Sequence, residues 1–352
     1  MDYRGLGTTG MQVSNLCLGA MMFGAWGEPD HDKSVAIIHR ALDAGVNFID
    51  TADVYSQGES EEIVGEALAG GKRDDVILAT KFHGAMDVSM MSGEKGDPNR
   101  KGNSRRWMIR EVEDSLRRLQ TDWIDLYQVH RWDHWTSHEE TLSALTDIQA
   151  QGKIRAFGCS TFPAHEIVEA RWTSERRGIG HYSTEQPPYS LLTRGTEADV
   201  LPVAGRYGMG VIPWSPLAGG WLTGRKRGEG EETPRQKMMS NRFDMSLPGN
   251  QRKAEAVDQL EKVAEEAGLT MIHLALGFVL AHPAVTAPII GPRTMEHLES
   301  QLGAAEVTLS KDVLDKIDEI VPPGLDTVSG ERSFTPPAVA EASLRRRPSG
   351  LA

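Results

Sequence analysis

In three places a short apolar segment of the sequence ends on an ionisable residue: Asp50, Lys81 and His130. Tyr55 stands on the loop behind Asp50, just before a Ser-Gln-Gly turn signal. A free phenol has a pKa of about 10, so Tyr55 becomes an effective proton donor only beside a Lys or a His that lowers this pKa. A Tyr, a Lys and a His at neighbouring strand ends therefore predict proton transfer to or from a carbonyl oxygen.

The elements that would position these residues alternate between strand-like and helix-like segments. Apolar runs predict eight strands, at residues 14–20, 46–50, 76–81, 122–130, 153–160, 182–186, 210–214 and 285–290. Helical spacing and capping residues predict helices at residues 33–44, 59–69, 104–119, 138–151, 163–176, 195–207, 251–267, 271–282, 294–304 and 310–320. Eight repeated β-then-α units predict a closed (β/α)₈ barrel, with the last helices added at the C-terminal end. A doubly wound open sheet is the alternative, but the Gly-x-Gly-x-x-Gly turn that it needs after the first strand is absent.

A barrel of this kind carries its chemistry at the carboxyl ends of its strands. Polar side chains stand at these ends in the order Asp50, Lys81, His130, Ser160 with Thr161, and Gln186. Taken alone, each has an ordinary interpretation as a cap, a solvated terminus or a hydrogen-bonded structural group. Their occurrence at successive strand ends indicates an active site. Asp125 and Gln128 lie inside a strand and are interpreted as polar groups of the core.

The composition is that of an ordinary soluble globular protein. The chain has 352 residues and a formal net charge of -12, which disfavours nucleic acid as a partner. No apolar run approaches the roughly 20 residues of a membrane helix, and the N-terminus lacks the apolar core of a signal peptide. We expect a cytoplasmic protein with a small-molecule substrate, no membrane partner and reduced cysteines at Cys17 and Cys159. No Cys/His spacing predicts a metal site.

The motifs as a set closely resemble an aldo-keto reductase of bacterial type, from about residue 3 to about residue 321. They include an N-terminal Leu-Gly-x-x-Gly hairpin and the segments at residues 45–55, 79–81, 125–130, 158–160, 214–217 and 291–294. The resemblance implies one catalytic domain over residues 1–321. Residues 322–352 are expected to form a tail that is partly disordered or packed near the active site.

The resemblance also implies an activity, which is NADPH-dependent reduction of an aldehyde or ketone to an alcohol. Tyr55 would be the general acid, Lys81 and Asp50 would tune its pKa, and His130 would orient the carbonyl. NADPH would lie extended across the top of the barrel. Its implied contacts are Gly19, Ser160, Thr161, Gln186, Trp214, Ser215, Pro216, Leu217, Gly219, Gly291, Arg293, Thr294, His297 and Gln301. Two of these depart from the family pattern, because Thr161 stands where Asn is common and His297 where Gln is frequent.

Aromatic residues on loops at the catalytic end, Phe23, Trp26, Trp132 and Trp135, predict an apolar substrate pocket. The loop at residues 218–250 is rich in glycine and carries Arg225, Lys226 and Arg227, which is typical of a flap that closes over a bound cofactor. Two other functions stay open. One is a channel-associated subunit of the same fold with little turnover, and the other is a Schiff-base lyase with Lys81 as nucleophile.

Overall fold

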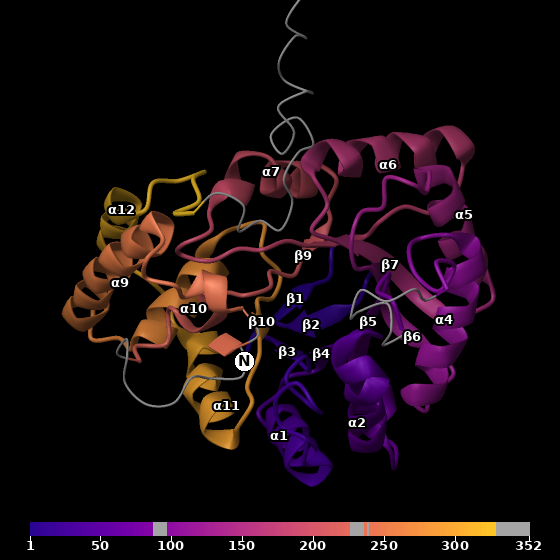
Figure 1. Cartoon of the computed structure of the whole chain (residues 1–352), viewed down its shortest axis with the longest axis horizontal. Helices are drawn as coiled ribbons and strands as arrows, with labels where there is room; N and C mark the ends of the chain where they lie inside the picture. The colour runs from indigo at the N-terminus through magenta and orange to yellow at the C-terminus, as the bar shows by residue number, and fades with distance from the viewer. Residues whose placement is uncertain (87–96, 226–235, 238, 329–352) are drawn as a thin grey trace, which may run out of the picture.

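Most strands of the described residues form one parallel sheet that closes into a barrel, and two more form a separate hairpin (Figure 1). The computed structural model describes residues 1–86, 97–225, 236–237 and 239–328. The sheet has eight strands in the order β10-β3-β4-β5-β6-β7-β8-β9. Their bounds are β3 (Cys17–Gly19), β4 (Phe48–Asp50), β5 (Ile77–Phe82), β6 (Ile124–Val129), β7 (Ile154–Ser160), β8 (Thr184–Gln186), β9 (Gly210–Val211) and β10 (Ile289–Ile290).

The barrel closes where the segment leading into β10 meets β9. A parallel bridge joins Val211 to Val285, and the backbone N–H of Ile289 donates to the carbonyl of Pro213 at 2.8 Å. Closure leaves no open sheet edge at this point, which confirms the (β/α)₈ barrel and rules out the doubly wound sheet.

Helices surround the strands, as Figure 1 shows for most of them. They are α1 (His31–Asp43), α2 (Glu59–Leu68), α4 (Arg105–Arg118), α5 (His138–Ala150), α6 (Ala164–Arg177), α7 (Val200–Arg206), α9 (Pro248–Glu266), α10 (Met271–Ala281), α11 (Met295–Leu302) and α12 (Lys311–Ile320). The predicted caps are confirmed, because the Ser104 hydroxyl accepts from the N–H of Trp107 and the Ser310 hydroxyl from that of Val313. Gly45 lies just beyond α1 with φ of 91°, as a C-terminal glycine should.

The segment predicted as one helix at residues 195–207 is interrupted. It divides into a 3₁₀ turn at Gly195–Ala198 and the helix α7, with Asp199 between them at φ −143°. The Asp199 side chain accepts from the N–H of Val200 and so begins the second part. The prediction of a single continuous helix is therefore wrong here. An Asp in the middle of the segment caps a new helix more readily than it continues the preceding one.

A short antiparallel hairpin, β1 (Tyr3–Gly5) with β2 (Gln12–Ser14), precedes the barrel as expected. Leu6 and Val13 of the hairpin region are fully buried. They belong to one apolar cluster with inward-facing residues of the strands, which are Cys17, Phe48, Ala79, Leu126, Ala156, Ile212 and Ala287. The hairpin therefore covers the amino-terminal end of the barrel interior and leaves the carboxyl end for polar groups.

Alternation along the strands then determines which side chains reach that polar end. Residues two apart on a strand face the same side. Asp50 thus follows Phe48 on the inner face, Lys81 follows Ala79, and Gln128 follows Leu126.

The segment after α12 begins by packing on the loop that follows β8. The N–H of Arg194 donates to the carbonyl of Leu325, and the N–H of Thr327 donates to that of Leu192. Residues 329–352 of the expected tail lie outside the described residues. Within the described part, no single helix is long and apolar enough to cross a membrane, although α9 and α10 meet the length and composition test together as a pair bent by 92°.

Close packing between β7 and β8 generates a stability prediction. A Cβ placed on Gly158 would lie 1.9 Å from the Thr184 hydroxyl oxygen and 2.9 Å from its carbonyl oxygen. Gly158→Ala should therefore lower the free energy of unfolding by about 1–3 kcal/mol, measured by urea denaturation. Gly205→Ala is the matched control, because a Cβ there meets nothing within 4 Å inside α7 and should be neutral or slightly stabilising. Equal stabilities of the two variants would contradict the packing argument.

Candidate active site

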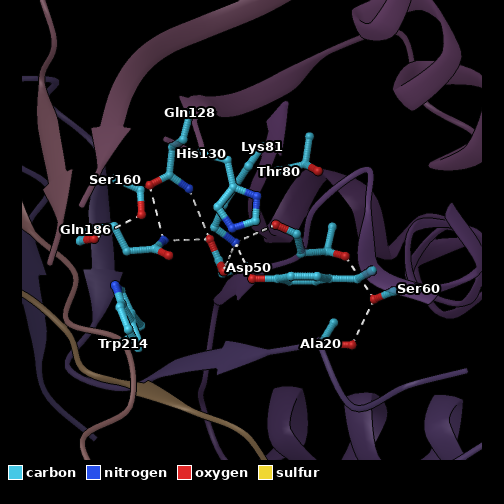
Figure 2. Close-up of polar contacts among 12 residues, drawn as sticks. Ala20, Asp50, Ser60, Thr80, Lys81, Gln128, His130, Ser160, Gln186 and Trp214 are labelled. Atoms are coloured by element: carbon cyan, nitrogen blue, oxygen red, sulfur yellow. Dashed lines mark hydrogen bonds and ion pairs between the residues drawn. The ribbon is translucent and has the colours of Figure 1, made fainter. Parts of the chain in front are cut away.

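The Lys81 ammonium lies at the centre of the polar end of the barrel and is fully buried. Its Nζ donates to Asp50 Oδ2 at 2.5 Å, to the Thr51 carbonyl at 2.8 Å and to the Tyr55 hydroxyl oxygen at 3.2 Å (Figure 2). These three acceptors use all three donors of the ammonium. The structure therefore brings together Asp50, Tyr55 and Lys81 as the sequence predicted.

Asp50 is held in turn by two amides from strands across the barrel. Its Oδ1 accepts from Gln128 Nε2 at 3.0 Å and from Gln186 Nε2 at 2.9 Å, while Gln186 Nε2 also lies 3.2 Å from Gln128 Oε1. The sequence interpretation of Gln128 as a polar group of the core did not include this hydrogen bond to Asp50. Its spacing of two from His130 on one strand was the signal, because both side chains then face the barrel interior.

The charge state of the centre follows from burial and neighbours. Burial disfavours the Lys81 ammonium, but the Asp50 carboxylate and the Tyr55 oxygen outweigh it, so the pKa of Lys81 is raised above its ordinary value. Burial lowers the pKa of His130 well below its ordinary value, and the nearby charges of Arg131 and Lys81 lower it further. At neutral pH the site thus holds an ammonium and a neutral imidazole.

The rings of His130 and Tyr55 lie edge to face, with centroids 5.7 Å apart. In the described part of the chain, neither nitrogen of the His130 ring has a hydrogen-bond partner. A neutral imidazole and a phenol therefore face the same space, where both can donate to one oxygen atom.

The loop that carries Tyr55 has an unusual backbone. Ser56, Gln57 and Gly58 have φ of 48°, 61° and 97°, which places three successive residues in the left-handed region. The Ser56 hydroxyl compensates by donating to the Phe23 carbonyl at 3.1 Å and accepting from the Trp26 N–H at 3.1 Å. These bonds join the loop after β3 to the Tyr55 loop and hold the phenol in place.

A buried ionic cluster supports this loop from below. Arg118 Nε donates to Glu61 Oε2 at 2.6 Å, and its Nη2 also bonds Glu111. A Cβ on Gly58 would lie only 2.7 Å from Arg118 Cδ, so the guanidinium stem packs directly under the turn. Asp53, two residues before Tyr55, is fully buried beside the cluster, and burial raises the pKa of its carboxyl well above its usual range.

Ser160, Thr161, Gln186 and Trp214 lie side by side at the next strand ends (Figure 2 shows Ser160, Gln186 and Trp214). Thr161 Oγ1 accepts from Trp214 Nε1 at 3.2 Å and from Arg131 Nη1 at 3.1 Å. Thr161 Oγ1 also lies 3.4 Å from Ser160 Oγ, which itself donates to the Gln186 carbonyl at 3.0 Å and can accept the Thr161 proton. A group of hydroxyl and amide side chains beside an indole ring fits the carboxamide and the ring of a nicotinamide.

A cleft of about 410 Å³ continues outward from Trp214. It is lined in part by Ser215, Ala218 and Gly219, which have φ of 56°, 49° and 70°, and by Arg242. A cationic residue beside a tightly turned backbone fits the pyrophosphate of a dinucleotide. Arg242 was not among the predicted contacts, and Lys226 and Arg227 of the expected flap lie outside the described residues.

The residues expected at the adenosine end gather at the start of α11. Thr294 is its cap and accepts from the N–H of His297 at 3.2 Å. Gln301 is buried, and its Oε1 has no hydrogen-bond partner within the described ranges, which fits an adenine amino group as donor. Arg293 precedes the cap, partly exposed and with no carboxylate within ion-pair distance in the part of the chain described.

Two glycines expected to contact the cofactor differ in their surroundings. A Cβ on Gly19 would lie 2.5 Å from the Ile289 side chain, so β3 and β10 can approach closely only with glycine here. Gly291 has open space at its Cβ position. Pro216 and Leu217 connect Ser215 to Ala218 along the cleft.

The predicted substrate residues separate into two groups. Phe23 is fully buried in the core and offers no surface to a substrate, so the prediction of a pocket contact is corrected. The prediction relied on the loop position of Phe23, but the backbone carbonyl of Phe23, not its ring, takes part in the site by accepting from the Ser56 hydroxyl. Trp26 is partly exposed with its ring centroid 6.1 Å from that of Tyr55, Trp132 is also partly exposed, and Trp135 is 86% exposed.

A buried polar site at the carboxyl end of a (β/α)₈ barrel is the arrangement of barrel enzymes. The sequence model of the Aldo/keto reductase family matches residues 15–322, and the chain belongs to this family. It is 38% identical to an uncharacterized oxidoreductase, YrpG, of Bacillus subtilis over 93% of this chain and 98% of the relative.

Two further relatives carry names that bear on function. A putative aryl-alcohol dehydrogenase of Saccharomyces cerevisiae is 32% identical over 90% of this chain and 85% of its own length. A probable voltage-gated potassium channel subunit beta of Oryza sativa is 34% identical over 91% of this chain and 97% of its own length. Similar chains thus include proteins named as enzymes and as a channel subunit.

Glu185, next to Gln186 on β8, leads to a prediction of how stability depends on pH. It is fully buried, and burial raises its pKa from 4.5 to about 7. A raised carboxyl pKa contributes stability that is complete below about pH 4.5 and lost as pH rises through 7.

Relative to Glu185→Gln, the wild type should therefore lose about 3 kcal/mol of unfolding free energy between pH 4.5 and pH 8, at about 1.4 kcal/mol per unit of pKa shift. Urea denaturation at several pH values measures this difference. A constant difference across the range would contradict the shift.

Proposed function

We propose that this chain is an NADPH-dependent carbonyl reductase that converts an aldehyde or ketone to an alcohol. The observation that carries the proposal is the contact of the buried Lys81 ammonium with both Asp50 and the Tyr55 hydroxyl. When bound, the reduced nicotinamide would supply a hydride. The oxygen of the carbonyl group then gains negative charge, which a proton donor must neutralise.

Tyr55 is the proton donor in this scheme. The Lys81 ammonium 3.2 Å from its oxygen stabilises the phenolate that forms when the proton leaves. Asp50 fixes that ammonium, and neutral His130 donates a second hydrogen bond to the substrate oxygen, which orients the carbonyl. Tyr55 and His130 therefore act directly on the oxygen atom where charge develops, while Lys81 and Asp50 act through Tyr55.

The proposed cofactor contacts divide along its length. Ser160, Thr161 and Gln186 hold the carboxamide and Trp214 stacks on the ring. The cleft from Ser215 to Gly219 takes the pyrophosphate, Arg293 the 2′-phosphate, and Gln301 the adenine. Residues 1–321 would form the catalytic domain.

A preference for NADPH over NADH rests on Arg293. A guanidinium is always charged and suits a phosphate group. Because Arg293 has no carboxylate partner within the described residues, its charge is available to a ligand.

A Schiff-base lyase fits the site less well. Lys81 is fully buried under Tyr55 with all its protons engaged, and its pKa is raised, so it lacks the free amine that a nucleophile needs. A channel-associated role would use the same cofactor site. Absence of turnover over a wide carbonyl panel would favour that role.

Tyr55→Phe removes the proton donor and keeps the ring. Reduction of a carbonyl substrate should fall by about two orders of magnitude or more, the range that general acids supply, while NADPH affinity changes little. Lys81→Met should be similarly impaired. Tyr3→Phe is the matched control, because Tyr3 lies half exposed on the N-terminal hairpin. Near-normal steady-state turnover of Tyr55→Phe would exclude Tyr55 as the acid.

Arg293→Ala should weaken NADPH binding by about tenfold or more and barely affect NADH, since only NADPH carries the 2′-phosphate. Fluorescence titration of each cofactor measures both affinities. Equal losses for the two cofactors would refute the role assigned to Arg293.

A further inference from the structure

Arg131 directly follows the catalytic His130 and lies partly buried between two other strand ends. Its Nη1 donates to the His130 carbonyl at 2.6 Å and to Thr161 Oγ1 at 3.1 Å. The guanidinium carbon lies 6.0 Å from the centroid of the Trp214 ring. These contacts place a cation beside the space that Tyr55 and His130 share.

The charge of Arg131 is not neutralised by a neighbouring acid. Over residues 1–86, 97–225, 236–237 and 239–328, no carboxylate lies within ion-pair distance of it, and its Nε and Nη2 have no acceptor. Glu185 is the acid whose charge acts on it, but the raised pKa of about 7 leaves that carboxyl partly protonated at neutral pH. A partly desolvated guanidinium with one free edge fits a planar anion.

The cofactor offers no anion at this position. In the proposed binding mode its charged groups lie at the cleft beside Arg242 and at Arg293, while the carboxamide beside Thr161 is neutral. A group that meets the Nε–Nη2 edge therefore comes with the substrate. Because the whole chain carries a net charge of -12, an anionic substrate also needs a local cation to enter.

We propose that Arg131 is a specificity-determining residue that binds a carboxylate on the carbonyl substrate, through the free edge of its guanidinium. This proposal rests on the proposed reductase function and deepens it, because it assigns a substrate class: aldehydes or ketones that carry a carboxylate near the reacting carbonyl. Arg131 holds that carboxylate while the carbonyl oxygen faces Tyr55 and His130.

The test compares kcat/KM for the three carboxybenzaldehyde isomers, each against its own methyl ester, with NADPH. The wild type should prefer the acid of at least one isomer. Arg131→Met should lower that acid-to-ester ratio by about 10- to 100-fold, the range that charge-assisted hydrogen bonds supply. Arg131→Lys should lie between, because it keeps the charge and loses the planar fork. Arg155→Met is the matched control and should leave the ratio unchanged, since Arg155 is exposed near the amino-terminal end of β7, away from the candidate site.

A purely structural role would lower kcat/KM for acid and ester equally, and an unchanged ratio in Arg131→Met would overturn the proposal. A loss of NADPH affinity of tenfold or more with an unchanged ratio would make Arg131 a cofactor ligand and would also overturn it.

If the wild type reduces none of these carbonyls, a wide carbonyl panel tests the reductase function separately from the anion site. Calorimetric titration of benzoate into the NADP⁺-loaded protein then tests the anion site itself. Binding that Arg131→Met weakens tenfold or more supports the anion site, and equal binding in both proteins rejects it.

Discussion

The buried ammonium of Lys81 is the constraint on which the site depends. A charge inside a barrel is tolerated only when it is paired and its hydrogen bonds are satisfied. Asp50, the Thr51 carbonyl and the Tyr55 oxygen meet that requirement, and Gln128 and Gln186 satisfy Asp50 in turn. The centre therefore joins strands β4, β5, β6 and β8. Removing one member leaves another buried polar group unpaired, so the geometry around Tyr55 behaves as a unit.

The rest of the barrel separates stability from chemistry along the strand axis. An apolar layer under the N-terminal hairpin fills the lower interior, and the polar layer follows two residues later on the same strands. Most of the non-glycine residues with a left-handed backbone lie at the upper end, among them Ser56 and Gln57 near the phenol and Ser215 and Ala218 along the cleft. Gln120, in the turn between α4 and β6, is an exception at the lower end. Arg118 with Glu61 and Glu111 supports the turn at Ser56 and Gln57 from the helix layer. The position of Tyr55 is thus determined by packing on both sides of the sheet.

Much of this organisation could be predicted from the sequence. Apolar runs ending in Asp50, Lys81 and His130 indicated both the strands and the end that carries chemistry, because strand periodicity and the barrel rule are local and general. The sequence analysis did not single out the contacts of Gln128, Arg131 and Arg242 at the candidate site, since these contacts involve distant strands and loops. Phe23 was misplaced because loop position does not reveal burial. The break at Asp199 followed from a cap that competes with helix continuation.

The central claim is that this barrel end transfers hydride to a carbonyl carbon with Tyr55 as the acid. Its most direct test is a single-turnover reaction of an aldehyde with NADPH deuterated at one of the two C4 positions of the nicotinamide, followed by mass spectrometry of the alcohol. The account predicts deuterium on the carbinol carbon from one of the two labelled cofactors and not from the other. Alcohol without label from either cofactor, or label lost to solvent, would contradict it.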